Sequence, residues 1–191
     1  MTSKAIPTHL VTGATGAGKT MFVARLLAQK PRGERWAVLV NDFGLKTLRD
    51  APGVSEGEVM VREVAGCICC SAQVAVRTAL IALIRAARPH RLLIEASAAA
   101  EPDALLSVLR EPGIAPAVAL RPTLAIASAS QLANAHYLAN ALYRKQLRAA
   151  DGVVISAATE EEDRAGRAIL RDITRPDKPV YAAAAFALPQ L

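Results

Sequence analysis

Residues 13–20, GATGAGKT, constrain the fold more than any other stretch of this 191-residue chain. They follow an apolar run typical of a buried strand, THLVTG at 8–13, and lead into a helical pattern at 19–29. A G-x-x-x-x-G-K-[ST] loop between a strand and a helix predicts a phosphate-binding loop, because its backbone N–H groups and the helix N-terminus face the anion. The alternative is a glycine-rich turn that matches the pattern by chance.

The residue types in this loop predict that the bound anion belongs to a nucleotide. The glycines allow the backbone to turn its amides toward phosphates. Lys19 is expected to reach the β- and γ-phosphates, and the Thr20 hydroxyl is expected to be a ligand of Mg²⁺. The predicted nucleotide-binding residues of the loop are Gly13, Gly16, Ala17, Gly18, Lys19, Thr20 and Met21.

Strand-length apolar runs alternate with helical patterns along the whole chain. This alternation predicts an α/β fold, a mostly parallel sheet with helices on both faces, and ligands bound at the carboxyl ends of the strands. Ser71 and Ser130 are expected to be helix N-caps. The expected strands are 8–13, 36–41, 58–64, 91–96, 123–128, 152–157 and 178–183, and the expected helices are 19–29, 72–87, 102–110, 130–149 and 160–172.

Composition excludes several classes of protein. The net charge of +6 comes from arginines spread along the chain, and aromatic residues make up only 4%, so we expect no nucleic-acid partner. No apolar run reaches membrane-spanning length and no secretory leader is visible, so we expect a cytoplasmic protein without a membrane partner. The three histidines, His9, His90 and His136, have no ligand spacing and are expected at the surface or at a strand edge.

All three cysteines of the chain lie together, Cys67, Cys69 and Cys70 in GCICC. In a reducing compartment this cluster is interpreted as a metal site, since soft thiolates favour Zn²⁺ or Cu⁺ over Mg²⁺. Three thiolates do not close a tetrahedral zinc site, so water, a partner or a carboxylate such as Asp42 would be the fourth ligand. Buried structural cysteines and a redox pair remain as alternatives.

Together these motifs resemble the CobW-like family of P-loop GTPases, relatives of the UreG and HypB metal-insertion GTPases. The resemblance covers roughly residues 8–181. The stretches that carry it are GATGAGKT, VNDFG at 40–44, GCICC, IEASAAAEP at 94–102 and QLRAADGVVIS at 146–156. In this order they are similar to the family's phosphate loop, its Asn-Glu-Phe-Gly segment, its cysteine signature, its Glu-Thr-Ser-Gly segment and the approach to its guanine loop.

The resemblance implies a GTPase that uses Mg²⁺ and couples its nucleotide state to a Zn²⁺ or Co²⁺ site at the cysteines. Lys19 and Glu95 would be the catalytic residues. Asp42 would bind Mg²⁺ or the transferred metal, and Ser156 would contact the nucleotide. The strand at 58–64 joins the cluster to the phosphate site. A metalloprotein client and a second copy of the chain, as a homodimer, are further implied partners.

The chain departs from the family pattern at several positions. The guanine-reading Asn-Lys-x-Asp loop falls on residues 156–159, SAAT, so the carboxylate that accepts the guanine donors is missing unless Glu160 replaces it. Ala98 replaces a glycine of the γ-phosphate sensor, and Ser128 replaces an aspartate. The chain ends at Leu191, so we expect one domain, 1–191, without the smaller C-terminal CobW domain.

These departures keep two other functions open. One is a nucleotide-binding regulator that does not hydrolyse its ligand. The other is an ATP-using P-loop enzyme such as a small kinase, for which a missing guanine loop is no loss. Phosphate release with Mg²⁺ separates the regulator from an enzyme.

Overall fold

The computed structural model describes residues 5–41, 48, 58–64 and 72–188. Apolar residues on successive positions form strands that are buried on both faces, as parallel strands between two helical layers require. Every residue of β2 is buried, for example. The strands are β1 (Ile6–Thr12), β2 (Trp36–Val40), β3 (Val59–Glu63), β4 (Arg91–Glu95), β5 (Val118–Leu120), β6 (Leu124–Ser128), β7 (Gly152–Ser156) and β8 (Val180–Ala182).

The helices connect these strands. The α-helices are α1 (Lys19–Ala28), α3 (Ala72–Ala87), α4 (Pro102–Leu109), α5 (Ala129–Leu132), α6 (Ala135–Ala139), α7 (Ala141–Ala149) and α8 (Glu160–Ile173), and the 3-10 helices are η1 (Ala115–Ala117) and η2 (Ala183–Ala185). No helix within the described ranges is long and apolar enough to cross a membrane.

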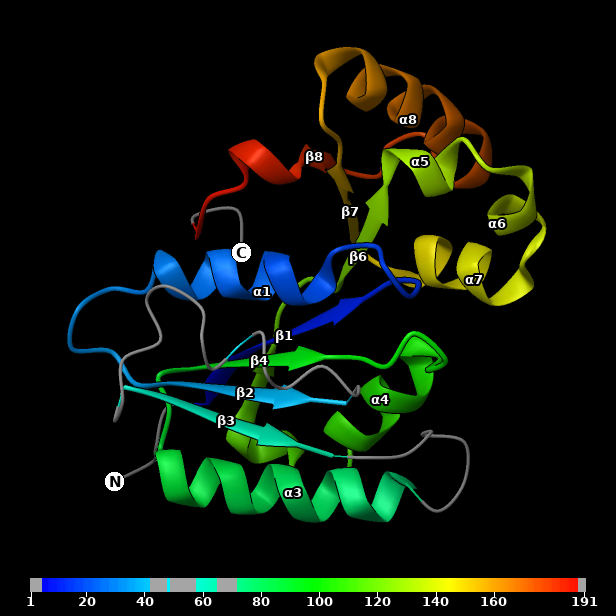
Figure 1. Ribbon diagram of the computed structural model, residues 1–191. Helices are drawn as coiled ribbons and strands as arrows, with labels where there is room; N and C mark the ends of the chain where they lie inside the picture. Colours follow the sequence, from blue (N-terminus) through cyan, green and yellow to red (C-terminus); the bar gives the residue numbers. More distant parts are fainter. Residues whose placement is uncertain (1–4, 42–47, 49–57, 65–71, 189–191) are drawn as a thin grey trace.

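The strands form one sheet in the order β3-β2-β4-β1-β6-β7-β8, and β5 pairs with β1 beside this path. Every ladder recorded among the described strands is parallel. The strand arrows in Figure 1 therefore point to one edge of the sheet. Val11 of β1 is level with Glu95 of β4, so the loops after these two strands begin side by side.

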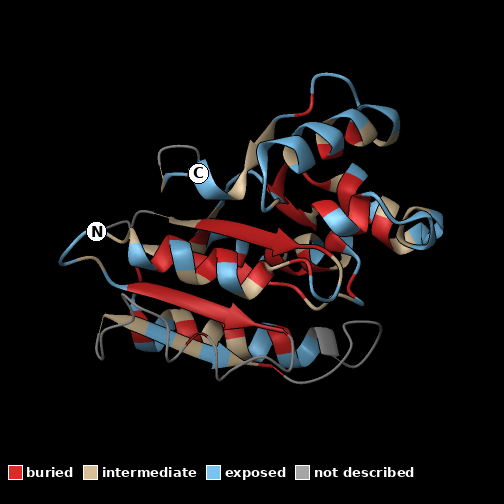
Figure 2. Ribbon diagram, turned by 45° about the horizontal axis from the view of Figure 1, so that its top comes forward, coloured by how far each residue is buried: buried red, intermediate tan, exposed pale blue. Residues whose placement is uncertain are grey.

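Helices cover both faces of the sheet (Figure 1). On one face α1 packs through Phe22, Val23 and Leu26 onto the sheet. On the other face α3 and α4 cover one half of the sheet, and α7 and α8 cover the half around β6 and β7. Figure 2 shows buried strands between helices that are buried on one side and exposed on the other. The predicted three-layer α/β fold is confirmed.

The helix predicted at 130–149 is wrong, because the structure has three short helices there. Asn134 and Asn140 interrupt it, since each side-chain oxygen accepts a backbone N–H of the next helix, from His136 and Tyr143. Ser130 is not an N-cap. Ser128 caps α5 instead, and its side chain accepts the N–H of Gln131.

The short strand β5 was not predicted. Its three residues, Val118–Leu120, continue the sheet beside the start of β1, where Ile6 is level with Val118. Such a short strand carries no periodicity of its own. It pairs with the start of β1 on the side where β6 pairs only from Val11 onward.

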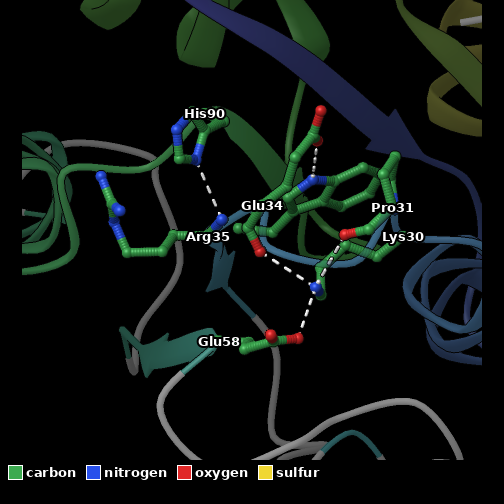
Figure 3. Close-up of polar contacts among 7 residues, drawn as sticks. Lys30, Pro31, Glu34, Arg35, Glu58 and His90 are labelled. Carbon is green, nitrogen blue, oxygen red and sulfur yellow. Dashed lines mark hydrogen bonds and ion pairs between the residues drawn. The ribbon is translucent and has the colours of Figure 1, made fainter.

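Side-chain contacts fix the opposite edge of the sheet, where β2 begins (Figure 3). The Lys30 ammonium donates to the Glu58 carboxylate at 2.7 Å and to the carbonyl of Glu34 at 2.9 Å. The backbone N–H of Arg35 donates to Nδ1 of His90 at 2.9 Å. These contacts tie the start of β2 to the segments that enter β3 and β4.

Candidate functional site

The loop between β1 and α1 lies tightly against β6. Gly13 has φ 139°, and a Cβ at this position would lie 2.3 Å from the carbonyl oxygen of Ile126, so only glycine fits. Gly16 and Gly18 have φ of 75° and 95°, and Gly18 is the N-cap of α1. The glycines of the motif therefore have a steric reason, and the loop they form leads directly into the N-terminus of a helix.

Lys19 is the first residue of α1 and is buried. Its ammonium donates to the carbonyl of Gly13 at 3.0 Å and to that of Ala14 at 3.1 Å. The positive charge is thus kept inside the loop. Among the other predicted loop residues, Ala17 is buried, whereas Met21 lies in the first turn of α1 with 66% of its surface exposed.

Thr20 and Glu95 meet although they are far apart in sequence. The Thr20 hydroxyl donates to Oε1 of Glu95 at 2.6 Å. Glu95 is the last residue of β4 and is only 1% exposed. The Ala96 N–H donates to the carbonyl of Val11, so the end of β4 is fixed to β1. The structure therefore places a hydroxyl and a carboxylate together at the start of α1, beside the phosphate-binding loop.

Two glutamines that the sequence analysis did not select also reach this region. Gln131 of α5 donates to the carbonyl of Thr15 in the loop at 2.8 Å. Gln146 of α7 donates to the carbonyls of Ala98 and Ala100 after β4. The sequence carries a signal for each glutamine. Ser128-x-x-Gln131 has the spacing of a capping box, and Gln146 lies on the apolar stripe of α7.

Residues 156–159, at the position expected for the guanine loop, lie between the end of β7 and the start of α8. Ser156 ends β7, and its hydroxyl lies 3.9 Å from where a Cβ on Gly18 would be. The Thr159 side chain caps α8 by accepting the N–H of Glu162, and the Glu162 carboxylate accepts the N–H of Ala158. Thr159, which stands where a guanine-reading carboxylate is expected, is therefore engaged in helix capping.

Two pockets flank this segment. One of about 580 Å³ lies between α1 and the ends of β6 and β7, and Gly18, Met21 and Ser156 line it. The other, of about 550 Å³, is lined by residues 157–160 and the first turns of α8. Ala183 borders both pockets, and charged side chains of α8 line the second one, Asp163, Arg164 and Arg167 among them.

The predicted metal site lies outside the described residues. Asp42, Cys67, Cys69, Cys70 and the expected N-cap Ser71 all fall in the undescribed ranges. Within the ranges that are described, no group of three His, Cys, Asp or Glu side chains could hold a metal ion.

The expectation for His9 is wrong. His90 and His136 are exposed, but His9 is fully buried in β1. Its Nε2 lies 2.7 Å from the Arg91 guanidinium of β4. Burial, and then the positive charges of Arg91 and Arg121, lower the pKa of His9 to about 3. The ring is therefore neutral and has a packing role, since β4 supplies it with a hydrogen-bond donor.

The family model of the CobW/HypB/UreG nucleotide-binding domain matches residues 7–178 of this chain. The zinc chaperone YeiR of Escherichia coli (strain K12) is 35% identical over 164 residues, which cover 86% of this chain and 50% of the relative. The zinc chaperone CobW of a Sinorhizobium species is 34% identical over 118 residues, 57% of this chain and 32% of the relative. This chain thus spans half or less of the length of these curated relatives.

A solved structure, the Zn(II)-bound YjiA GTPase from E. coli, aligns with a TM-score of 0.63 and 18% identity, over 94% of this chain and 57% of that one. At this identity the likeness shows the fold alone.

Proposed function

Because the chain belongs to the CobW/HypB/UreG nucleotide-binding domain family, we propose that it binds and hydrolyses GTP and couples its nucleotide state to a Zn²⁺ or Co²⁺ site at the CxCC motif. Relatives named as zinc chaperones support the metal part of this proposal. We place the protein in the cytoplasm, with a metalloprotein client and a second copy of the chain as partners.

The observation that carries the nucleotide part is the contact between Thr20 and Glu95 at the start of α1. A hydroxyl and a carboxylate oxygen, 2.6 Å apart, are ligand types that Mg²⁺ prefers, and the contact brings two of them to the edge of the phosphate-binding loop. These residues therefore fit Mg²⁺ with a bound nucleoside triphosphate. Bound there, Mg²⁺ would supply positive charge at the terminal phosphates.

The residues of the loop and the two carboxylates near it have separate roles in this proposal. Lys19 exchanges its two carbonyl acceptors for phosphate oxygens and neutralises the charge that develops on the leaving group. The backbone amides at Gly16, Gly18 and Met21 hold the phosphates. Glu95 orients Thr20, and Glu95 or Asp42 completes the metal or water shell.

The coupling to the cysteines rests on sheet topology. β3 is parallel to β2, and β2 is parallel to β4, so all three strands end at the edge of the sheet where Glu95 lies. Cys67 follows the end of β3 closely in sequence. A change in the loops around the terminal phosphate would therefore act near the segment that carries the thiols.

Mg²⁺-dependent nucleotide binding and phosphate release, compared between the wild type and Lys19→Met, test this proposal. We expect both activities in the wild type and at least a hundredfold loss of turnover in the variant, on the order found when a charge-stabilising group is removed. Lys145→Met is the control, because Lys145 of α7 is an exposed lysine that pairs with Glu101, the N-cap of α4. Turnover that survives in Lys19→Met contradicts the assigned site.

One observation favours a second candidate function, a P-loop protein that uses ATP or accepts both nucleotides. Thr159 caps α8, and no carboxylate stands at its position to accept the guanine donors. Comparison of GTP and ATP in the same assay separates the candidates. Binding without phosphate release would indicate a regulator that does not hydrolyse its ligand.

A further inference from the structure

The chain between β6 and β7 sends two glutamine side chains toward the candidate site, and each holds the backbone of a different loop. Gln131 donates to the carbonyl of Thr15 at 2.8 Å. Gln146 donates to the carbonyls of Ala98 at 2.9 Å and Ala100 at 3.1 Å. The two residues are only 5% and 1% exposed. Their amides therefore act on the loops and not on solvent.

The capping box fixes the orientation of Gln131. Its side-chain oxygen accepts the backbone N–H of Ser128, and its own backbone N–H donates to the Ser128 hydroxyl. With the oxygen engaged in this way, the amide nitrogen faces the phosphate-binding loop. Ser128 at the end of β6 thus orients the Gln131 amide that donates to Thr15.

Gln146 holds a loop whose own side chains are short. Residues 97–100 are Ser-Ala-Ala-Ala, so no long side chain of the segment itself can anchor it. A turn between the Ala100 N–H and the Ser97 carbonyl shapes the segment from within. The amide nitrogen of Gln146 donates to two carbonyls of this turn. These bonds fix the position of the loop relative to α7.

A pocket of about 370 Å³ lies between the two loops. Ala14 and Thr15 form one wall, Ala98 and Ala99 form another, and Gln146 lines the pocket from α7. A shift of residues 98–99 would therefore change the space directly beside the phosphate-binding loop.

We propose that Gln146 is a positioning residue that sets the loop after β4 for the terminal phosphate of a bound nucleoside triphosphate, whereas Gln131 sets the phosphate-binding loop for any bound nucleotide. This inference rests on the proposed nucleotide binding. The terminal phosphate distinguishes a triphosphate from a diphosphate, and loops beside it order around it in P-loop proteins. The phosphate-binding loop, in contrast, contacts both nucleotides.

The two glutamines allow a matched test. The affinities of a non-hydrolysable GTP analogue and of GDP, with Mg²⁺, are measured for the wild type, Gln146→Met and Gln131→Met. Methionine keeps the approximate length of the side chain and removes its amide, which at Gln131 also removes the oxygen that accepts the Ser128 N–H. We expect Gln146→Met to weaken the triphosphate analogue by about tenfold and GDP by less than about twofold. Gln131→Met is expected to weaken both ligands by similar factors.

The outcomes distinguish a failure of the proposed nucleotide binding from a failure of the role assigned to Gln146. A wild type that binds neither nucleotide overturns the proposed function. A wild type that binds both, with Gln146→Met weakening both equally or neither, overturns only the role of Gln146.

Should Gln146→Met fail to fold, amide hydrogen exchange on the wild type gives the answer. Residues 96–101 are expected to gain protection with the triphosphate analogue and not with GDP. Equal protection by both ligands overturns the inference.

Discussion

The buried histidine of β1 gives a quantitative prediction of how stability depends on pH. His9 is 0% exposed, and its Nε2 lies 2.7 Å from Nη1 of Arg91. The guanidinium can only donate, so the ring must accept at Nε2 and is neutral. The same guanidinium lies over the ring of Trp36, 5.1 Å from its centroid. Protonation of His9 would place two cations in contact inside the sheet.

The size of this effect on the free energy of unfolding follows from the pKa values of His9 in the folded and unfolded states. The pKa is about 3 in the folded state and 6.5 for an unperturbed histidine. The unfolded chain therefore takes up the proton first as pH falls. The contribution of His9 to stability is fully present above pH 6.5 and is lost progressively toward pH 3. Between about pH 7.5 and about pH 5, this linkage lowers the free energy of unfolding by about 2 kcal/mol.

Urea denaturation across this pH range measures the effect. Other groups also titrate, so the comparison is with His9→Gln, which keeps an acceptor for Arg91 but does not titrate. We expect the stability of the variant to fall by about 2 kcal/mol less than that of the wild type over the same range. His136→Gln, at an exposed histidine of α6, is the matched control for the change of residue type.

An equal pH dependence in His9→Gln and the wild type would refute the reasoning. If His9→Gln does not fold, NMR titration of the wild-type ring decides, because the His9 resonances should not titrate above about pH 4.

Three substitutions test other parts of the structure. Thr159→Asp keeps an N-cap for α8 and adds a carboxylate, so competition binding should show a GTP preference over ATP raised by about tenfold, with Glu161→Gln in the first turn of α8 as an unchanged control. Gly13→Ala should lose at least about 2 kcal/mol more stability in urea than Gly33→Ala, since both glycines have positive φ but only the first meets Ile126. Lys178→Met should lower the free energy of unfolding by about 2–3 kcal/mol, because the buried ammonium donates to three carbonyls at the end of α7. Lys145→Met, which removes an exposed ion pair, should change the free energy of unfolding by less than about 1 kcal/mol.

The parts of the fold that were predicted correctly are those with strong local signals. The loop requires glycines because its backbone has positive φ or approaches another strand closely, and the predicted strand and helix lie directly before and after it. Buried runs such as β2 and β7 contain apolar residues on successive positions, which indicate a parallel sheet. Fold class and family therefore follow from the sequence.

What the sequence did not predict has two causes, local helix caps within a helical pattern and partners that are distant along the chain. The period between 130 and 149 is helical, but Asn134 and Asn140 each begin a new helix, because their side chains accept backbone N–H groups two and three residues further on. The contact between Gln131 and Thr15 joins residues that are 116 positions apart. Polar residues in a helical pattern are assigned to solvent by default, so a glutamine that binds a distant carbonyl is missed.

The coupling between nucleotide binding and zinc binding can be measured as a linkage between the two affinities. The affinity for a non-hydrolysable GTP analogue, with Mg²⁺, is measured on the reduced protein with and without one equivalent of Zn²⁺. The comparison is a variant with Cys67, Cys69 and Cys70 replaced by serine. We expect zinc to change the nucleotide affinity at least about fivefold in the wild type only, and the nucleotide to change the zinc affinity by the same factor. Nucleotide affinity that is identical with and without zinc in the wild type would contradict the proposed coupling.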